Sequence, residues 1–260
     1  MKRREFLSAS FFAGAASLST IAASINESDE TKPEYYELRR YHMLNRSKQK
    51  VLDDFLGNAA IPAMNRIGIE PVGVFSVIYG PNSPTLYVLL PHESLESFAV
   101  ATSRLTADAK YQSAGASFLN APLSDPAYVR IESSLMVAFE RMPELKVPEK
   151  KSRIFELRRY ENHSVKVSKK KIEMFNAGGE IEIFLKTGLQ PVFFGETLIG
   201  PRLPNLTYML VFDDMAERDR RWSVFSGSPE WKKLRSAPEY ADIVVNVNVI
   251  FLRPTPYSQI

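Results

Sequence analysis

The chain has 260 residues, of which 33 are Lys or Arg and 30 are Asp or Glu, giving a formal net charge of +3 at pH 7. This near-neutral, mixed-charge composition argues against a nucleic-acid partner, which requires a concentrated positive surface. The chain contains no Cys, which excludes disulfides, a thiol nucleophile and a lipid-modified cysteine.

The first 24 residues have the pattern of a twin-arginine export signal. Arg3 and Arg4 stand just ahead of an apolar run from Phe6 to Ala23, which is diluted by Ser, Gly and Ala and ends in small residues. We therefore expect a signal peptide over 1–24 and a periplasmic or secreted protein. An ordinary secretory signal or an uncleaved anchor is the alternative. No other segment is apolar enough to cross a bilayer, so no stable membrane span is expected after signal removal.

The pentapeptide Glu-Leu-Arg-Arg-Tyr occurs twice, at 37–41 and at 156–160. The two halves also match in further segments, "IGIEPV" (67–72) with "TGLQPV" (187–192) and "YGPNSPTL" (79–86) with "IGPRLPNL" (199–206). This correspondence indicates a duplication, and it predicts a first domain over 34–142 and a second over 153–254. The charged segment between them, 143–152, contains Pro143 and Pro148 and is expected to be a linker.

Each copy shows the same order of hydrophobic periodicities, which predicts the β-α-β-β-α-β order of a ferredoxin-like unit. The first copy predicts strands over 34–42, 72–79, 85–91 and 128–140 and helices over about 47–66 and 93–104; the second predicts strands over 153–161, 191–199, 205–212 and 243–253 and helices over 166–186 and 214–226. Both helices of a unit cover one face of its sheet and leave the other face open. The fold class is therefore α+β, with two tandem units that pair their sheets into an eight-stranded α+β barrel.

Several motifs resemble those of the NIPSNAP family: "YELRRY" and "FELRRY" at the start of each unit, "MFNAGGE" (174–180), "GLQPVFFGE" (188–196), "PNLTYMLVFDDMAERDRRW" (204–222), "SPEWKKL" (228–234) and "RPTPYSQI" (253–260). The resemblance covers nearly the whole chain after the leader and is stronger in the second half. The first half has Ala59, Ala60 and Thr102 where the second has Gly179, Glu180 and Trp222. Membership of the dimeric α+β barrel superfamily is implied. Relatives there include haem-degrading and cofactor-free monooxygenases, whereas NIPSNAP proteins look more like binding proteins.

Polar side chains alternate along the repeated strand, so they sort to one face by period two. Because the first and last strands of a ferredoxin-like unit are neighbours, we expect their polar faces to line the barrel interior together, with Leu38 and Leu157 directed to the helices. The candidate ligand-binding residues are Glu156, Arg158, Tyr160, Asn246 and Asn248, with Glu196 as a further candidate, and in the first half Glu37, Arg39 and Tyr41, joined by Glu132 and Ser134.

Two interpretations of this pattern stay open. In the first, arginine holds an anionic or carbonyl group while tyrosine or glutamate moves a proton. In the second, Glu and Arg on one strand pair with each other and only stabilise the barrel. The three histidines, at positions 42, 92 and 163, have no metal-ligand spacing, so no metal site is predicted, although a haem ligand among them stays open.

The predicted function is that of an exported barrel that binds a small molecule or a protein partner without a cofactor. The alternative is a cofactor-free or haem-dependent monooxygenase or isomerase that acts in the barrel interior. Whether the protein is an enzyme, and whether it forms a homo-oligomer, is not decided by the sequence.

Overall fold

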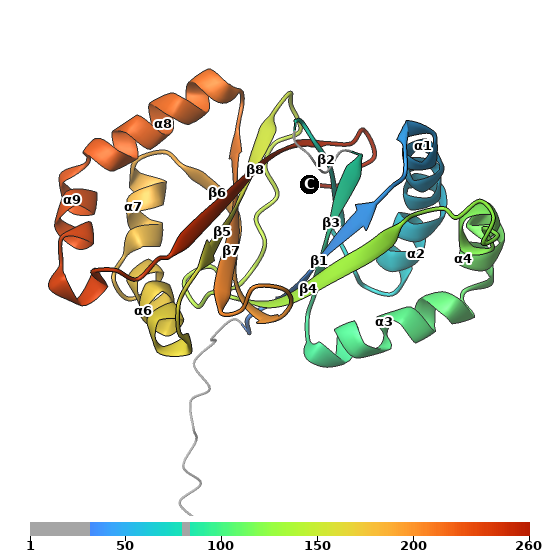
Figure 1. Cartoon of the computed structure of the whole chain (residues 1–260), viewed down its shortest axis with the longest axis horizontal. Coiled ribbons are helices and arrows are strands. Elements are labelled where there is room, and N and C mark those ends of the chain that lie inside the picture. Colours follow the sequence, from blue (N-terminus) through green and yellow to red (C-terminus); the bar gives the residue numbers. More distant parts are fainter. Residues whose placement is uncertain (1–31, 80–83) are drawn as a thin grey trace, which may run out of the picture. The chain divides into compact units, whose positions relative to one another are not determined.

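Eight antiparallel strands form the centre of the computed structural model, which describes residues 32–79 and 84–260. The expected signal peptide lies outside the described residues. The strands are β1 (Tyr35–His42), β2 (Gly73–Val77), β3 (Thr85–His92), β4 (Arg130–Ala138), β5 (Ile154–Glu161), β6 (Gln190–Ile199), β7 (Asn205–Phe212) and β8 (Asn246–Pro254). They close into a barrel in the order β1-β3-β2-β8-β5-β7-β6-β4 (Figure 1).

Two seams join the halves of the chain into this single barrel. Within each half the first strand pairs with the third and the fourth, β1 with β3 and β4, and β5 with β7 and β8. Between the halves, β2 pairs with β8 and β4 pairs with β6. The expected ferredoxin-like units and the closed eight-stranded barrel are therefore confirmed.

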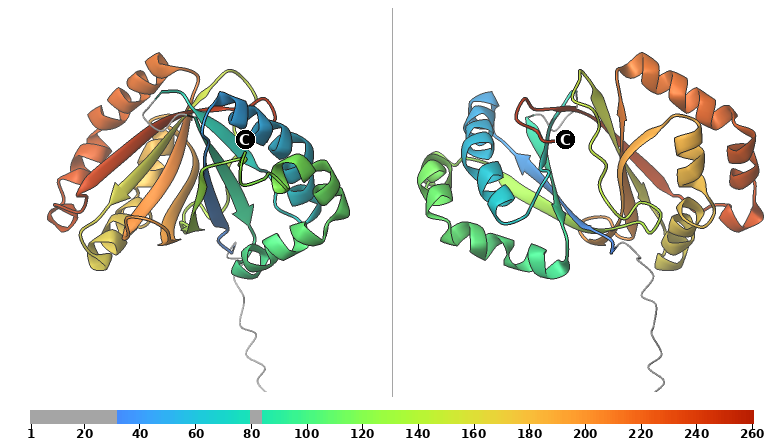
Figure 2. Two further views of the ribbon diagram at one scale, coloured as in Figure 1. Left: turned by 45° about the vertical axis from the view of Figure 1, so that its right-hand side comes forward. Right: turned by 180° about the vertical axis from the view of Figure 1, so that it is seen from behind.

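The helices lie outside the barrel, those of the first half on one side and those of the second half on the other, as both views of Figure 2 show. They are α1 (Arg46–Phe55), a π-helical turn (Leu56–Ala60), α2 (Ile61–Arg66), α3 (Leu95–Ala107), α4 (Ala109–Ala114), α5 (Ala116–Leu119), α6 (Val165–Phe175), α7 (Glu180–Lys186), α8 (Met215–Gly227), α9 (Pro229–Arg235) and a 3-10 turn (Pro238–Tyr240). None of these helices is long and apolar enough to cross a membrane, a finding that concerns only the described residues.

The long helices start and stop at residues that the two halves share in type. One polar residue precedes each of the helices α1, α3, α6 and α8, and its side-chain oxygen accepts a hydrogen bond from the backbone N–H three residues later. These residues are Asn45, Ser94, Ser164 and Asp214, in that order. After α2 and α7, Gly68 and Gly188 adopt φ near +83°, a conformation that favours glycine and ends the helix.

Apolar side chains from both halves fill the barrel interior, and two more apolar clusters lie between the sheet and the helices. The interior cluster includes Tyr36, Leu38, Phe75, Leu89, Met136, Phe155, Leu157, Phe193, Met209, Leu252 and Ile260. The expectation that Leu38 and Leu157 face the helices is therefore wrong, because both belong to the interior cluster. Strands β3 and β7 are buried along their whole length because both of their faces are covered.

Candidate functional site

The strand register decides which candidate side chains share a face of the sheet. Directly opposite residues in an antiparallel pair project to the same side. Arg158 lies opposite Val249, whereas Arg159 lies opposite Asn248. The asparagines of β8 therefore share a face with Arg159 and not with Arg158. The same rule applies in the first half, where Arg40 lies opposite Glu132.

The predicted site residues are consequently divided between two faces, and the expectation that they all line the interior is wrong. The helix-covered side holds Glu37, Arg39, Tyr41, Glu156, Arg158, Tyr160 and Glu196; the interior side holds Glu132, Ser134, Asn246 and Asn248. The period-two alternation was predicted correctly. The choice of face failed because it depends on the register with the neighbouring strand, which alternation within one strand does not specify.

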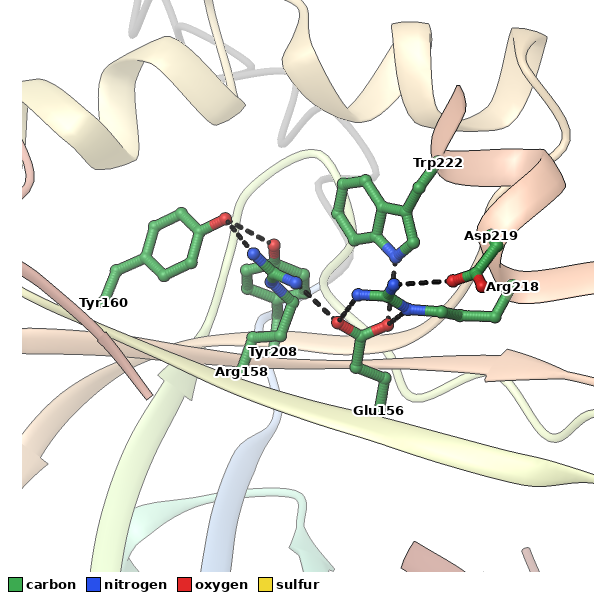
Figure 3. Close-up of polar contacts among 7 residues, drawn as sticks. All are labelled: Glu156, Arg158, Tyr160, Tyr208, Arg218, Asp219 and Trp222. Carbon is green, nitrogen blue, oxygen red and sulfur yellow. Dashed lines mark hydrogen bonds and ion pairs between the residues drawn. The ribbon is translucent and has the colours of Figure 1, made fainter. Parts of the chain in front are cut away.

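On the helix-covered side of the second half, a fully buried carboxylate collects donors from three side chains (Figure 3). Glu156 accepts a hydrogen bond from Arg158 Nη1 at 2.5 Å, and Arg218 of α8 donates to it from Nε at 2.8 Å and from Nη2 at 3.0 Å. Trp222 Nε1 donates at 2.9 Å. Burial raises the pKa of Glu156, but these donors outweigh it, so the pKa is lowered overall. The carboxylate is thus held ionised inside its cluster.

Aromatic groups complete this Glu156 cluster, which consists of Glu156, Arg158, Tyr160, Tyr208, Arg218 and Trp222. The Arg158 guanidinium lies 4.6 Å from the Trp222 ring centre, a cation–π contact. Its Nη2 donates to the Tyr160 hydroxyl at 3.3 Å, and that hydroxyl lies 2.8 Å from the hydroxyl of Tyr208. Burial raises the pKa of Tyr208 well above its ordinary value. These contacts agree with the structural interpretation, because the charges satisfy one another.

The first half repeats this arrangement with different donors. Glu37 accepts hydrogen bonds from Arg39 Nε at 2.7 Å and Nη2 at 2.8 Å, and from the Ser133 hydroxyl at 2.7 Å. Burial raises the pKa of Glu37, but His92, Arg39 and Ser133 together lower it to about 2. Tyr41 belongs to the apolar cluster under the helices.

Two further candidates, Glu196 and Asn246, lie apart from the Glu156 cluster. Glu196 bonds Lys169 of α6 at 2.7 Å, and Asn246 donates to Glu161 at 3.2 Å near one end of the barrel. Both contacts are made by partly exposed side chains, so these residues do not join Arg158 in one pocket. The described residues contain no group of three or more His, Asp or Glu that could hold a metal ion.

On the interior side, Arg40 and Arg159 line two adjoining cavities. The inner cavity is about 40 Å³ and the wider one about 300 Å³. Both are lined by Arg40, Tyr87, Arg159, Pro201, Asn248 and Ile250. We refer to the space lined by these six residues as the arginine cavity. Arg40 and Arg159 are the equivalent second arginines of the repeated pentapeptide, so each half supplies one guanidinium.

The charges around the arginine cavity are not balanced. Arg40 forms an ion pair with Glu132, which lies directly opposite it. Arg159 instead faces the uncharged Asn248, and it shares Glu161 with Arg202, at 3.2 Å and 3.5 Å. Burial, with the charges of Arg202 and Arg40, lowers the pKa of Arg159. The second half therefore presents an incompletely neutralised guanidinium to the cavity.

Arg40 and Arg159 were not predicted as site residues, because the first arginine of each pair, Arg39 or Arg158, was expected inside the barrel. Both arginines of each pair recur in the two halves, so recurrence alone could not separate them. The available signal was the apolar residue between Glu and Arg, Leu38 or Leu157. An apolar barrel interior requires that residue to point inward, and with it the second arginine.

The NIPSNAP family model matches residues 36–139 and 155–259 of the chain. Candidate monooxygenases from Lactobacillus acidophilus NCFM and Fusobacterium nucleatum subsp. nucleatum each superpose on 86% of the chain with a TM-score of 0.55, at 9% and 10% sequence identity and with 94% and 93% of their own chains covered. A NIPSNAP-like domain protein from Burkholderia xenovorans is 21% identical over 42% of this chain and 90% of its own, with a TM-score of 0.38. No curated protein matches the chain.

The likeness to the two candidate monooxygenases concerns the fold, since so low an identity carries no residue of a site with it. The family match is different in kind, because its two segments span each repeat almost from the first strand to the last. The chain belongs to the NIPSNAP family, with two copies of the domain in tandem.

Proposed function

We propose that this protein is an exported binding protein that holds a small anionic molecule, such as a carboxylate, in the arginine cavity. The observation that carries the proposal is the pair of equivalent guanidiniums, Arg40 and Arg159, that line one cavity inside the barrel. Guanidinium groups bind carboxylates through paired, charge-assisted hydrogen bonds. Asn248 and Tyr87 add uncharged polar groups to the lining, which is the composition of a binding pocket.

The strand register favours Arg159 as the anion-binding group. The position opposite Arg40 is Glu132, while the position opposite Arg159 is the amide of Asn248. Arg159 shares Glu161 with Arg202, as Arg40 shares Glu132 with Arg130, so a ligand carboxylate next to Arg159 would add a second counter-charge for Arg159 and Arg202. A cavity of about 300 Å³ at the wider end suits a small metabolite.

Binding is favoured over catalysis by where the proton-moving candidates lie. Glu156 and Tyr160, which an oxygenase or isomerase would have used in the barrel interior, lie on the helix-covered face. The pKa of Glu156 is lowered by its donors, which opposes its use as a general base near neutral pH. Of the predicted tyrosines and glutamates, Glu132 alone lines the cavity, and its carboxylate forms an ion pair with Arg40.

Calorimetric titration of the purified chain with acetate, succinate and citrate tests the proposal, together with native mass spectrometry for a retained ligand. We expect Arg159→Gln to weaken binding at least tenfold, since a charge-assisted hydrogen bond contributes about 1.5 to 3 kcal/mol. Asn248→Asp should weaken it similarly by placing a carboxylate opposite Arg159. Arg220→Gln, on the exposed surface of α8, is the matched control and should bind as the wild type does.

Two outcomes would contradict the proposal. One is equal affinity in the wild type and in Arg159→Gln. The other is a wild type that retains no ligand after purification and binds none of the three carboxylates.

Export is the second part of the proposal, and it rests on Arg3 and Arg4 ahead of the apolar run. Replacing both arginines by lysine keeps the charge but removes the pattern that the twin-arginine pathway recognises. We expect the precursor of that double variant to remain in the cytoplasm, as followed by cell fractionation and immunoblotting. Full processing and export of the variant would instead assign an ordinary secretory signal.

A further inference from the structure

We propose a second anion-binding site, specific for a phosphate group, at the opposite end of the barrel from the arginine cavity. The site is a pocket of about 410 Å³ between residues 150–153 and residues 253–260, which we call the linker pocket. Strand β5 begins directly after Arg153 and reaches Arg159 near its other end. Six residues of extended chain separate the two arginines by about 20 Å, so one ligand does not occupy both sites.

The first observation is a buried arginine without a carboxylate. Arg153 has only 7% of its surface exposed. Its Nη1 donates to the backbone oxygens of Glu149 at 2.6 Å and Lys151 at 3.1 Å, while its buried Nε has no hydrogen-bond partner. In the stretches that the structure describes, no carboxylate forms an ion pair with this guanidinium. A buried charge without a counter-charge is unfavourable, and an anion in the pocket would supply one.

The second observation is that further cations line the same pocket. Lys150 and Arg253 contribute to its wall, and no ion pair with either is formed by the described residues. Lys151 also lines it but already pairs with Asp213 at 2.5 Å. Three cationic residues that form no ion pair within the described part of the chain, Lys150, Arg153 and Arg253, thus line the pocket, and no carboxylate side chain lines it.

The number of uncompensated cations indicates the class of ligand. A carboxylate carries one negative charge and two acceptor atoms, which one arginine satisfies. A phosphate monoester carries up to two charges and three acceptor oxygens, and it can bridge a guanidinium and two further cations. The hydroxyl of Ser152 adds a neutral donor to the wall. The volume of the pocket leaves space for the group esterified to the phosphate.

Thermal unfolding of the full chain in inorganic phosphate, compared with chloride at equal ionic strength, tests this site. At ten times the dissociation constant we expect phosphate to raise Tm by about 3 to 5 °C. Arg153→Met should abolish the rise without lowering the Tm measured in chloride. It removes a buried charge that has no counter-charge, and the two backbone oxygens that Arg153 bonds belong to the exposed residues Glu149 and Lys151, where water can replace it. Arg253→Gln, at an exposed position, should reduce the rise and provides a second variant should Arg153→Met fail to fold.

Two controls separate this site from other causes. Arg235→Gln, on the exposed face of α9, should keep the full phosphate effect. Arg159→Gln should keep it too, since it alters only the arginine cavity; loss of the effect there would place the phosphate in that cavity and overturn the proposal. No rise in the wild type, or a rise that persists in Arg153→Met, would overturn it as well. Carboxylate binding by Arg159 is tested separately, by the calorimetric titrations.

Discussion

Single residues differ between the halves even where the repeated pentapeptide is identical. Arg39 and Arg158 stand at equivalent positions, yet Arg39 shares Glu37 with the uncharged hydroxyl of Ser133, whereas Arg158 shares Glu156 with a second guanidinium, that of Arg218. Trp222 covers Arg158, and the first half has Thr102 at the corresponding position. The repeated pentapeptide therefore specifies the strand but not the side chains that bond its charged residues. Those side chains come from helices whose sequences differ between the halves.

The shared carboxylate gives the first prediction. Glu156→Gln removes the buried counter-charge of Arg158 and one of the two carboxylates that bond Arg218, which also pairs with Asp219 at 2.9 Å, so we expect it to lower the free energy of unfolding by about 3 to 5 kcal/mol. Adding Arg158→Met should restore part of this loss, because one stranded charge disappears. Urea unfolding measures both effects, with Glu182→Gln on the exposed surface of α7 as the control. A loss below about 1 kcal/mol would show that the cluster contributes little to stability.

Glu37 gives a prediction about pH. Its pKa is about 2 in the folded chain against 4.5 ordinarily, so the folded state binds fewer protons and the interaction stabilises the fold above about pH 4.5. That contribution, about 3 kcal/mol, is lost as pH falls from 4.5 to 2. The stability difference between the wild type and Glu37→Gln should shrink over this window. A difference that is constant with pH would contradict the assignment. Exposed Glu93→Gln should show little difference at any pH.

The residue scale is also where prediction from sequence was least complete. Alternation identified the two sets of side chains on β5, and Asn248 was correctly placed on the interior side. The set that contains Glu156 was assigned to the wrong side, because polar residues were expected inside and leucines outside. A charged group can face the helices only when neighbouring elements supply partners. Arg218 and Trp222, over 60 positions away, are not visible in the strand's own sequence.

At the scale of elements, the predicted strands and long helices all occur near their expected positions. Their sequence signals are local, namely period-two or helical spacing, capping side chains, and glycine or proline at the ends. The pairing of β4 with β6 has no such local signal. Only the structure shows that Gly195 of β6 lies opposite Ala138 of β4, where the missing side chain lets the two strands approach closely.

Gly195 supplies a prediction about this seam. A Cβ atom at position 195 would lie 2.9 Å from the Met136 Cβ atom, closer than packed atoms tolerate. We expect Gly195→Ala to lower the free energy of unfolding by about 1 to 3 kcal/mol through overpacking. The matched control is Gly227→Ala at the end of α8, where a Cβ atom meets nothing within 4 Å. That variant should be neutral or up to about 1 kcal/mol more stable, so equal effects of the two in chemical unfolding would contradict the argument.

At the scale of the whole molecule, neither half has a complete set of strand partners. Alone, the first half would expose one edge of β2, one edge of β4 and an apolar sheet face that includes Leu38 and Leu89. The duplication in the sequence was sufficient to predict this architecture, because an open apolar sheet face requires a cover and the second copy is tethered beside it.

This dependence predicts one cooperative unfolding transition for residues 25–260, as measured by calorimetry. A fragment of residues 25–145 should self-associate or aggregate, which size-exclusion chromatography would detect. Two separated transitions, together with a soluble monomeric fragment, would show that the halves fold independently.

The seam between β2 and β8 also has a consequence for how the chain folds during synthesis. Phe75 pairs with Pro254, about 180 positions later, so the barrel cannot close until residues 246–254 have left the ribosome. Throughout that time β2 keeps an unpaired edge, the kind of surface on which nascent chains aggregate. If the twin-arginine pathway carries the folded protein, the slow final closure takes place in the cytoplasm and comes before export. Docking of β8 would then have to be complete before the protein crosses the cytoplasmic membrane.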